Sequence, residues 1–288
     1  MTESGVAVTK LIIPKRGNSW VECEDACCVL PEGAASDLRS EPFTVVVSDG
    51  ASESTLAREW AQCLVRTMAV GIAEDPAALE GAGLSHGKVL THVCDEWELW
   101  HAGYLKQRTA VGRPPRWFEY PKLSAGAFAT TLAVHVNAPG SKHGAAVVAR
   151  HRRRWLAAAL GDSCLFQVRD GRLIRRFPMK TPAAFGNSPS LLGSRDRDWV
   201  QTGERTRFTR GYAEDGDELL LMTDALAAYL IDCADEAPGH SFDSIMYSLR
   251  EFGRTDDESG FEEWVNQQRA SGRLRNDDVT FVYIYFAG

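Results

Sequence analysis

Acidic residues stand at the ends of apolar, strand-like runs at several widely separated points of this chain. Four junctions have this form: residues 43–48 end in Asp49-Gly50, residues 155–160 in Gly161-Asp162, residues 218–223 in Asp224, and residues 279–286 begin after Asp277-Asp278. One such junction is ordinary, since Asp-Gly is a common turn. Four of them predict that the strand ends gather carboxylates in one place.

Clustered carboxylates have a specific chemical use. Mg²⁺ and Mn²⁺ prefer oxygen ligands, and two such ions about 3.5–4 Å apart can hold a phosphoryl group between them. The pattern therefore predicts a site for a pair of divalent cations.

Bulk composition excludes several classes of protein. The 288 residues are 44% hydrophobic and 25% charged, which is enough for a sizeable core. The formal net charge of -7 disfavours nucleic-acid binding. No apolar stretch approaches the length of a membrane span, and the start of the chain has no signal-peptide core. The seven cysteines include no C-x-x-C pair. We expect a reduced, cytoplasmic protein that binds neither nucleic acid nor membrane.

The order of the expected elements indicates the fold class. Strands are predicted at residues 6–13, 20–30, 43–48, 127–136, 144–149, 154–160, 164–169, 172–176 and 279–286. Helices are predicted at residues 54–73, 84–105, 227–231, 242–252 and 261–268, with Ser52 or Ser54 capping the first. Helices grouped around a run of strands favour an α+β fold with helices outside antiparallel sheets. With no linker or repeat, we expect one domain over residues 1–288.

Taken in order, six segments resemble motifs of the metal-dependent type 2C protein serine/threonine phosphatases. They are Glu24-Asp25, Val47-Ser48-Asp49-Gly50, residues 126–131, Gly161-Asp162-Ser163, Asp224-Ala225-Leu226 and Asp277-Asp278-Val279-Thr280. The resemblance extends over residues 16 to 286 and is of bacterial style. It implies an antiparallel β-sandwich flanked on both faces by α-helix pairs.

The resemblance also implies roles for individual residues. Asp49 would bridge two Mn²⁺ or Mg²⁺ ions and Gly50 would offer its carbonyl group. Asp224 and Asp277 would bind the first ion, and Asp162 a weaker third one. The acidic pair Glu24 and Asp25 would act through water molecules bound to the metals.

The implied activity is removal of phosphate from phosphoserine or phosphothreonine of proteins by water that two metal ions activate. The implied partners are a phosphorylated protein substrate and a cognate Ser/Thr kinase, and we expect a monomer. No cysteine or serine nucleophile is needed.

The chain departs from the family at several positions. Trp20 stands where the family has its phosphate-binding arginine, so that Arg16 or Lys15 would have to replace it. Ala51 and Ser52 follow Asp49-Gly50 where eukaryotic members have a histidine, and Ala225 replaces a glycine. The flap segment, residues 178–195, is short. The missing histidine is typical of bacterial members, whereas Trp20 and the short flap leave open an alternative, a catalytically weak relative that serves as a regulatory or binding module.

A basic run occupies residues 150–154. It lies between two expected strands, which favours an exposed turn. The functional alternative is the docking of an acidic partner.

Overall fold

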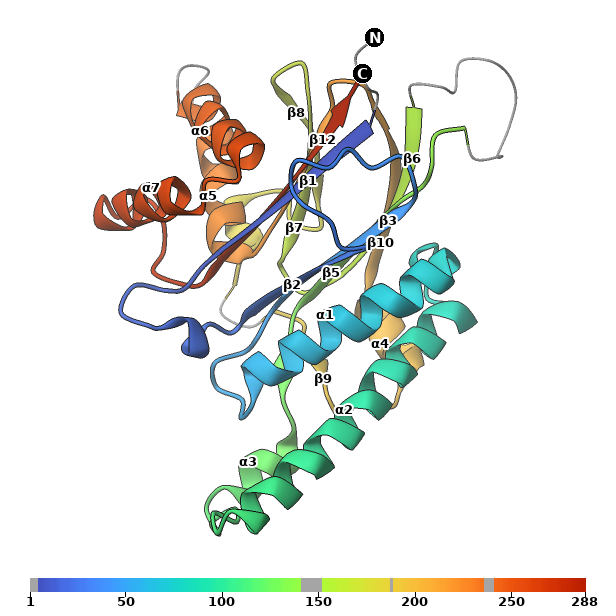
Figure 1. The fold of residues 1–288 in the computed structure, drawn as a ribbon, viewed down its shortest axis with the longest axis vertical. Helices are drawn as coiled ribbons and strands as arrows, with labels where there is room; N and C mark the ends of the chain where they lie inside the picture. The colour runs from blue at the N-terminus through green and yellow to red at the C-terminus, as the bar shows by residue number, and fades with distance from the viewer. Residues whose placement is uncertain (1–4, 141–151, 187–188, 236–240) are drawn as a thin grey trace.

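Two five-stranded antiparallel sheets lie face to face (Figure 1). The computed structural model describes residues 5–140, 152–186, 189–235 and 241–288. The first sheet has the order β1 (Gly5–Ile13), β12 (Val279–Ala287), β11 (Glu218–Met222), β7 (Cys164–Arg169) and β8 (Arg172–Phe177). The second sheet has the order β10 (Arg207–Glu214), β6 (Arg152–Leu160), β5 (Thr131–Val136), β3 (Phe43–Asp49) and β2 (Asp25–Leu30). A short pair, β4 (Phe128–Ala129) with β9 (Leu192–Gly193), lies beside them.

The inner faces of the two sheets form one of three apolar cores. Val45 and Trp155 of the second sheet pack with Leu219 and Val282 of the first, and all four are fully buried. Strands rich in β-branched and aromatic residues suit such a pleated, buried surface.

Helices cover the outer faces of both sheets (Figure 1). The helices are α1 (Ala57–Glu74), α2 (Leu84–Ala110), α3 (Tyr120–Ala125), α4 (Trp199–Arg205), α5 (Asp224–Asp235), α6 (Ser241–Thr255) and α7 (Glu258–Ala270). Trp60 of α1 packs with Leu156 over the second sheet, whereas Phe261 of α7 packs with Phe281 over the first. The predicted α+β sandwich with helices on both faces is confirmed. No helix among the described residues is long and apolar enough to cross a membrane.

Local signals placed most of these elements. The tight hairpin between β7 and β8 has Asp170 at φ 49° and Gly171 at φ 73°, the left-handed pair that a two-residue hairpin turn favours. The expected strand at residues 144–149 lies outside the described residues.

Three local predictions were wrong. Residues 20–22 form a 3₁₀ turn instead of a strand, because the Glu22 carboxylate accepts the backbone N–H of Ser19 at 2.9 Å. Helix α1 begins after Leu56, whose φ is 64°, and neither Ser52 nor Ser54 caps it. Within the basic run, Arg152 opens strand β6 instead of lying in a turn.

Candidate active site

Five carboxylates predicted from the sequence converge at one end of the sandwich. Asp25 and Asp49 are paired neighbours on β2 and β3. The Asp49 carboxylate interacts electrostatically with Asp25, Asp224, Asp277 and Asp162. Asp162 follows β6, Asp224 begins α5 after β11, and Asp277 precedes β12. Both sheets therefore contribute to the cluster. Burial and then the neighbouring negative charges raise the pKa of Asp49 well above its ordinary value.

Asp25 joins the two sheets. Its Oδ2 accepts hydrogen bonds from Oγ1 of Thr223 at 3.0 Å and Oγ1 of Thr280 at 2.8 Å, and both threonines belong to the side of the first sheet. Only 5% of Asp25 is exposed. Burial, followed by the charge of Asp278, raises its pKa well above the ordinary value. A carboxylate in this setting is costly unless a cation compensates it.

Three oxygens in the cluster have unsatisfied acceptor capacity. Oδ1 of Asp25, Oδ1 of Asp162 and Oδ1 of Asp224 are buried and have no hydrogen-bond partner among the described residues. Burial, and next the charge of Asp224, raises the pKa of Asp162 to about 6. Buried acceptors without donors fit a site that a cation completes. As arranged, however, no group of three or more His, Cys, Asp or Glu side chains among the described residues is close enough to hold a metal ion together.

An arginine lies between two of the expected ligands. The guanidinium of Arg275 donates a hydrogen bond to Oδ2 of Asp224 and lies 3.5 Å from Oδ2 of Asp277. Its positive charge compensates part of the negative charge of these two acids. Arg275 was not among the site residues predicted from the sequence, although its position two residues before Asp277 was a usable signal.

Asp278 makes different contacts from Asp277. Its Oδ1 accepts the backbone N–H of Lys15 at 2.7 Å, and its Oδ2 accepts the backbone N–H of Glu24 at 2.8 Å. Both oxygens are thereby used to tie the loop that follows β1 to the acidic cluster. Oδ2 of Asp277 lies 3.5 Å from the guanidinium of Arg275 and accepts no backbone amide among the described residues.

Glu24 stands at the edge of the cluster. Its Oε2 accepts a hydrogen bond from Oγ of Ser52 and lies 4.0 Å from Nζ of Lys15. Burial raises its pKa despite these contacts. The backbone oxygen of Glu24 also accepts the N–H of Gly50 at 3.2 Å.

Gly50 is required by packing. A Cβ at this position would lie 2.9 Å from the carbonyl oxygen of Ala57 and 3.0 Å from that of Glu24. The position after Asp49 therefore admits no side chain. This reason applies whether or not the Gly50 carbonyl binds an ion.

Thr130 and Ser163 position the Asp49 backbone. Oγ1 of Thr130 accepts the Asp49 N–H at 3.1 Å and is hydrogen-bonded to Oγ of Ser163 at 2.9 Å. Gly161 has φ 110° and lies so close to Thr130 that a Cβ would be 2.7 Å from it. The turn before Asp162 thus packs directly on the residue that orients Asp49.

A cleft of about 560 Å³ opens beside the cluster. Its lining includes Asp49, Asp277, the chain from Gly50 to Thr55, Lys122 of α3, and Pro189 and Leu191 of the flap segment. Lys122 is the cation among the lining residues, and sequence reasoning missed it because α3 has only six residues and no apolar periodicity.

The predicted phosphate anchor lies outside this lining. Arg16 is exposed, and its backbone N–H donates to Oδ1 of Asn276 at 2.8 Å. Among the described residues its guanidinium has no hydrogen bond or ion pair. Trp20, at the family's arginine position, is 53% exposed on its 3₁₀ turn. The structure thus keeps Arg16 near the acidic cluster through its backbone alone.

Comparisons with known proteins concern the family and the fold of this chain. A sequence profile described as protein phosphatase 2C matches residues 19–267. The fold is similar to that of the photosystem II phosphatase PBCP, with a TM-score of 0.52, 13% identity and 98% of each chain covered. It is also similar to a bacterial serine phosphatase, with a TM-score of 0.52, 10% identity and 98% of each chain covered. Among curated proteins, no sequence relative was found.

At these identities the structural likeness concerns the fold alone, whereas the profile covers most of the chain. The order of the acidic motifs, their convergence between the two sheets and the profile match lead to the same assignment. This chain belongs to the protein phosphatase 2C family.

Proposed function

We propose that this protein is a metal-dependent phosphomonoesterase that removes phosphate from phosphoserine or phosphothreonine of proteins. The observation that carries the proposal is the convergence of acidic side chains from both sheets on Asp49, with three buried carboxylate oxygens that lack a donor. Family membership supplies the reaction class.

The metal ligands in this proposal are Asp49, the carbonyl group of Gly50, Asp224 and Asp277 for two Mn²⁺ or Mg²⁺ ions, and Asp162 for a weaker third. Bound there, the ions would lower the pKa of a water molecule and neutralise charge on the phosphoryl group. Support comes from the donor set, since hard divalent cations take carboxylate and carbonyl oxygens.

The remaining residues of the site orient the acidic pair and contact the substrate phosphate. Thr223 and Thr280 hold Asp25, and Ser52 holds Glu24, so that this acidic pair presents fixed acceptors to bound water. Lys122 on the cleft wall and Arg16 on the neighbouring loop are the two cations that we propose for contact with the substrate phosphate. A charge-assisted contact from either would replace that of the arginine missing at Trp20.

The cleft favours a substrate that reaches it on an extended segment. Pro189 and Leu191 of the flap segment line it, and its walls at Phe128 and Leu191 are apolar. We therefore propose a phosphorylated protein as substrate and a cognate Ser/Thr kinase as the source of the phosphate. We further propose that residues 1–288 act as one domain, as a monomer in the cytoplasm.

A second candidate function is a catalytically weak regulatory module. The contact of Arg275 with Asp224 and Asp277 favours it, because an internal cation already neutralises part of the cluster. The absence of arginine at Trp20 points the same way.

Hydrolysis of p-nitrophenyl phosphate by the full chain separates the two. If the protein is a phosphatase, we expect turnover with Mn²⁺ or Mg²⁺, loss of turnover in a chelator, and recovery of turnover when the ion is restored. The Asp49→Asn variant is the control for a contaminating phosphatase. A folded protein without turnover in Mn²⁺, on this substrate and on a phosphothreonine peptide, would instead support the regulatory module.

A further inference from the structure

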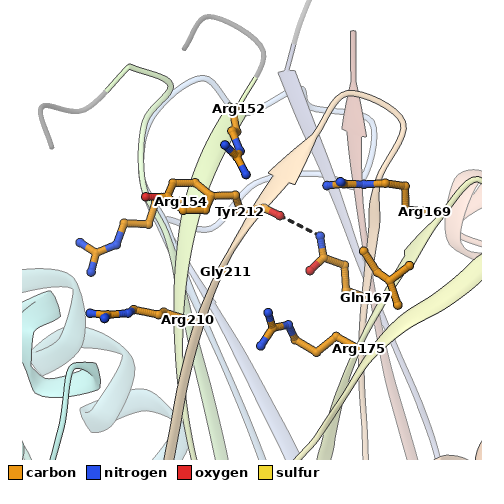
Figure 2. A pocket seen from close by; sticks show the side chains of 9 residues that line it. Arg152, Arg154, Gln167, Arg169, Arg175, Arg210, Gly211 and Tyr212 are labelled. Carbon is orange, nitrogen blue, oxygen red and sulfur yellow. Dashed lines mark hydrogen bonds between the residues drawn. The ribbon is translucent and has the colours of Figure 1, made fainter. Parts of the chain in front are cut away.

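A second cavity, of about 580 Å³, is lined mainly by arginine (Figure 2). The lining residues are Arg152, Arg154, Gln167, Arg169, Ile174, Arg175, Arg210, Gly211 and Tyr212. No acidic side chain belongs to this lining, although the whole chain carries a formal charge of -7. We call it the arginine cavity.

The arginine cavity lies where the sandwich is open. β8 and β10 are the edge strands of their sheets, and the cavity spans them. In the view of Figure 2, Arg154 and Arg210 extend on one side of the β10 ribbon and Arg175 approaches from the other. Gly211 also lines the cavity, and packing requires glycine there because a Cβ would lie 2.4 Å from the indole ring of Trp155.

The arginine cavity is separate from the candidate active site. The two share no lining residue. Arg154 stands near the start of β6, whereas Asp162 follows its end, and eight residues of strand span about 25 Å. A ligand of the arginine cavity would therefore not contact the acidic cluster.

Three of its arginines are engaged by acids outside the lining. Arg169 makes two hydrogen bonds of 2.7 Å to Asp217. Arg154 lies 2.8 Å from Glu80, and Arg152 lies 3.5 Å from Glu214. Arg169 also lies 3.4 Å from Glu214, and these contacts hold the three side chains in place.

Arg175 and Arg210 have no carboxylate partner among the described residues. The guanidinium of Arg175 lies 5.2 Å from the ring centre of Trp155 and donates to Oγ1 of Thr209 at 3.1 Å, so its position is fixed by neutral groups. Arg210 is exposed at the rim. The cavity thus has two unpaired cations beside three that are pre-positioned.

This arrangement suits phosphate groups. Guanidinium groups are planar forks that bind phosphate oxygens in pairs, and the cavity has the volume of a small-molecule site. Ile174 and the ring of Tyr212 are the apolar groups of the lining, beside the five arginines. An added peptide strand is less suited, because the Tyr212 carbonyl on β10 already accepts Nε2 of Gln167 at 2.8 Å. We propose that the arginine cavity binds a small anion that carries at least two phosphate groups.

Calorimetric titration of the full chain tests the proposal, with inorganic triphosphate and ATP as separate probes. A chelator is present throughout, so that the acidic cluster cannot bind phosphate through metal ions. We expect saturable binding of triphosphate that weakens as salt rises. Equal affinity for ATP means that the phosphates alone are recognised, and tighter binding of ATP means that the nucleoside also contacts the cavity; both support the proposal.

Matched variants locate the binding. Arg210→Glu should weaken triphosphate binding about tenfold or more, because it replaces an unpaired cation by an anion. Arg207→Glu is the control, since Arg207 is exposed on the same strand but outside the lining. On β8, Arg175→Ala should also weaken triphosphate binding, and Arg172→Ala, outside the lining, is its control. Melting temperatures verify that all four variants fold.

Three results would overturn the proposal. The first is that neither triphosphate nor ATP binds saturably. The second is that Arg207→Glu weakens binding as much as Arg210→Glu. The third is that a glutamate-rich peptide binds in an Arg210-dependent way while the phosphate compounds do not, which would make the cavity a docking site for acidic protein segments.

Discussion

The guanidinium of Arg275 donates a hydrogen bond to Oδ2 of Asp224 and stands 3.5 Å from Oδ2 of Asp277. These two acids are the proposed ligands of the first metal ion. An ion that binds between them has to displace a positive charge that the chain itself provides. Arg275 is about half exposed, so it can move into solvent when the ion arrives.

Removing this cation should strengthen metal binding. We expect Arg275→Gln to lower the Kd for Mn²⁺ about three- to tenfold and to lower the melting temperature of the metal-free protein, because the acids then repel each other without compensation. Titration calorimetry and thermal unfolding measure the two effects. Arg273→Gln, an exposed neighbour, is the control. Weaker Mn²⁺ binding in Arg275→Gln would mean that the arginine positions the acids instead of competing for them.

Replacing the proposed central ligands should abolish most activity. Asp49→Asn or Asp277→Asn removes one charged ligand, and we expect kcat to fall about 100-fold or more with folding retained. Asp162→Asn should reduce it less at saturating Mn²⁺. Near-normal rates of both Asp49→Asn and Asp277→Asn would refute the ligand assignment.

The metal-free protein should become less stable as pH rises. The pKa of Asp162 is about 6 in the folded protein against an ordinary 3.8, so the native state binds more protons between these values. Its contribution therefore favours the unfolded state increasingly as pH rises through this range. We expect Asp162→Asn in chelator to be more stable than the parent at pH about 7 and to converge with it near pH about 4. Urea unfolding across pH measures this, and a constant difference would contradict it.

The substrate phosphate needs a cation in place of the missing arginine at Trp20. We expect Lys122→Ala to raise KM for a phosphothreonine peptide about tenfold, because Lys122 lines the cleft, with Mn²⁺ affinity unchanged. Arg16→Ala should raise KM several-fold if its side chain reaches the phosphate. Lys106→Ala on the exposed face of α2 is the control. An unchanged KM in Arg16→Ala removes Arg16 as an anchor, and an unchanged KM in Lys122→Ala removes Lys122.

Local signals in the sequence were sufficient for much of the architecture. β7 was predicted with its observed bounds, and the hairpin at Asp170-Gly171 was placed correctly, because strand alternation and turn residues act over a few positions. Helices α1 and α2 were also predicted, although not with their observed ends, because their buried faces repeat at helical spacing. The positions of the acidic residues at strand ends were readable for the same reason.

Strand β10 lacks such local signals. Its residues were not predicted as a strand, since it is an edge strand with most side chains partly or fully exposed and no clear alternation. Its pairing with β6 joins residues 48 to 62 positions apart. The arginine cavity depends on this pairing, so the run at Arg152 looked like a mere turn in the sequence.

The sequence by itself determined the family, the two sheets with their outer helices, and which carboxylates stand at strand ends, because these depend on local periodicity and on ordered motifs. Only the tertiary structure decided that Arg275 faces Asp224, that Lys122 reaches the cleft, and that Asp278 is used by backbone amides of the loop after β1. Each of these depends on how elements distant in the chain pack against one another, which no short stretch of sequence encodes.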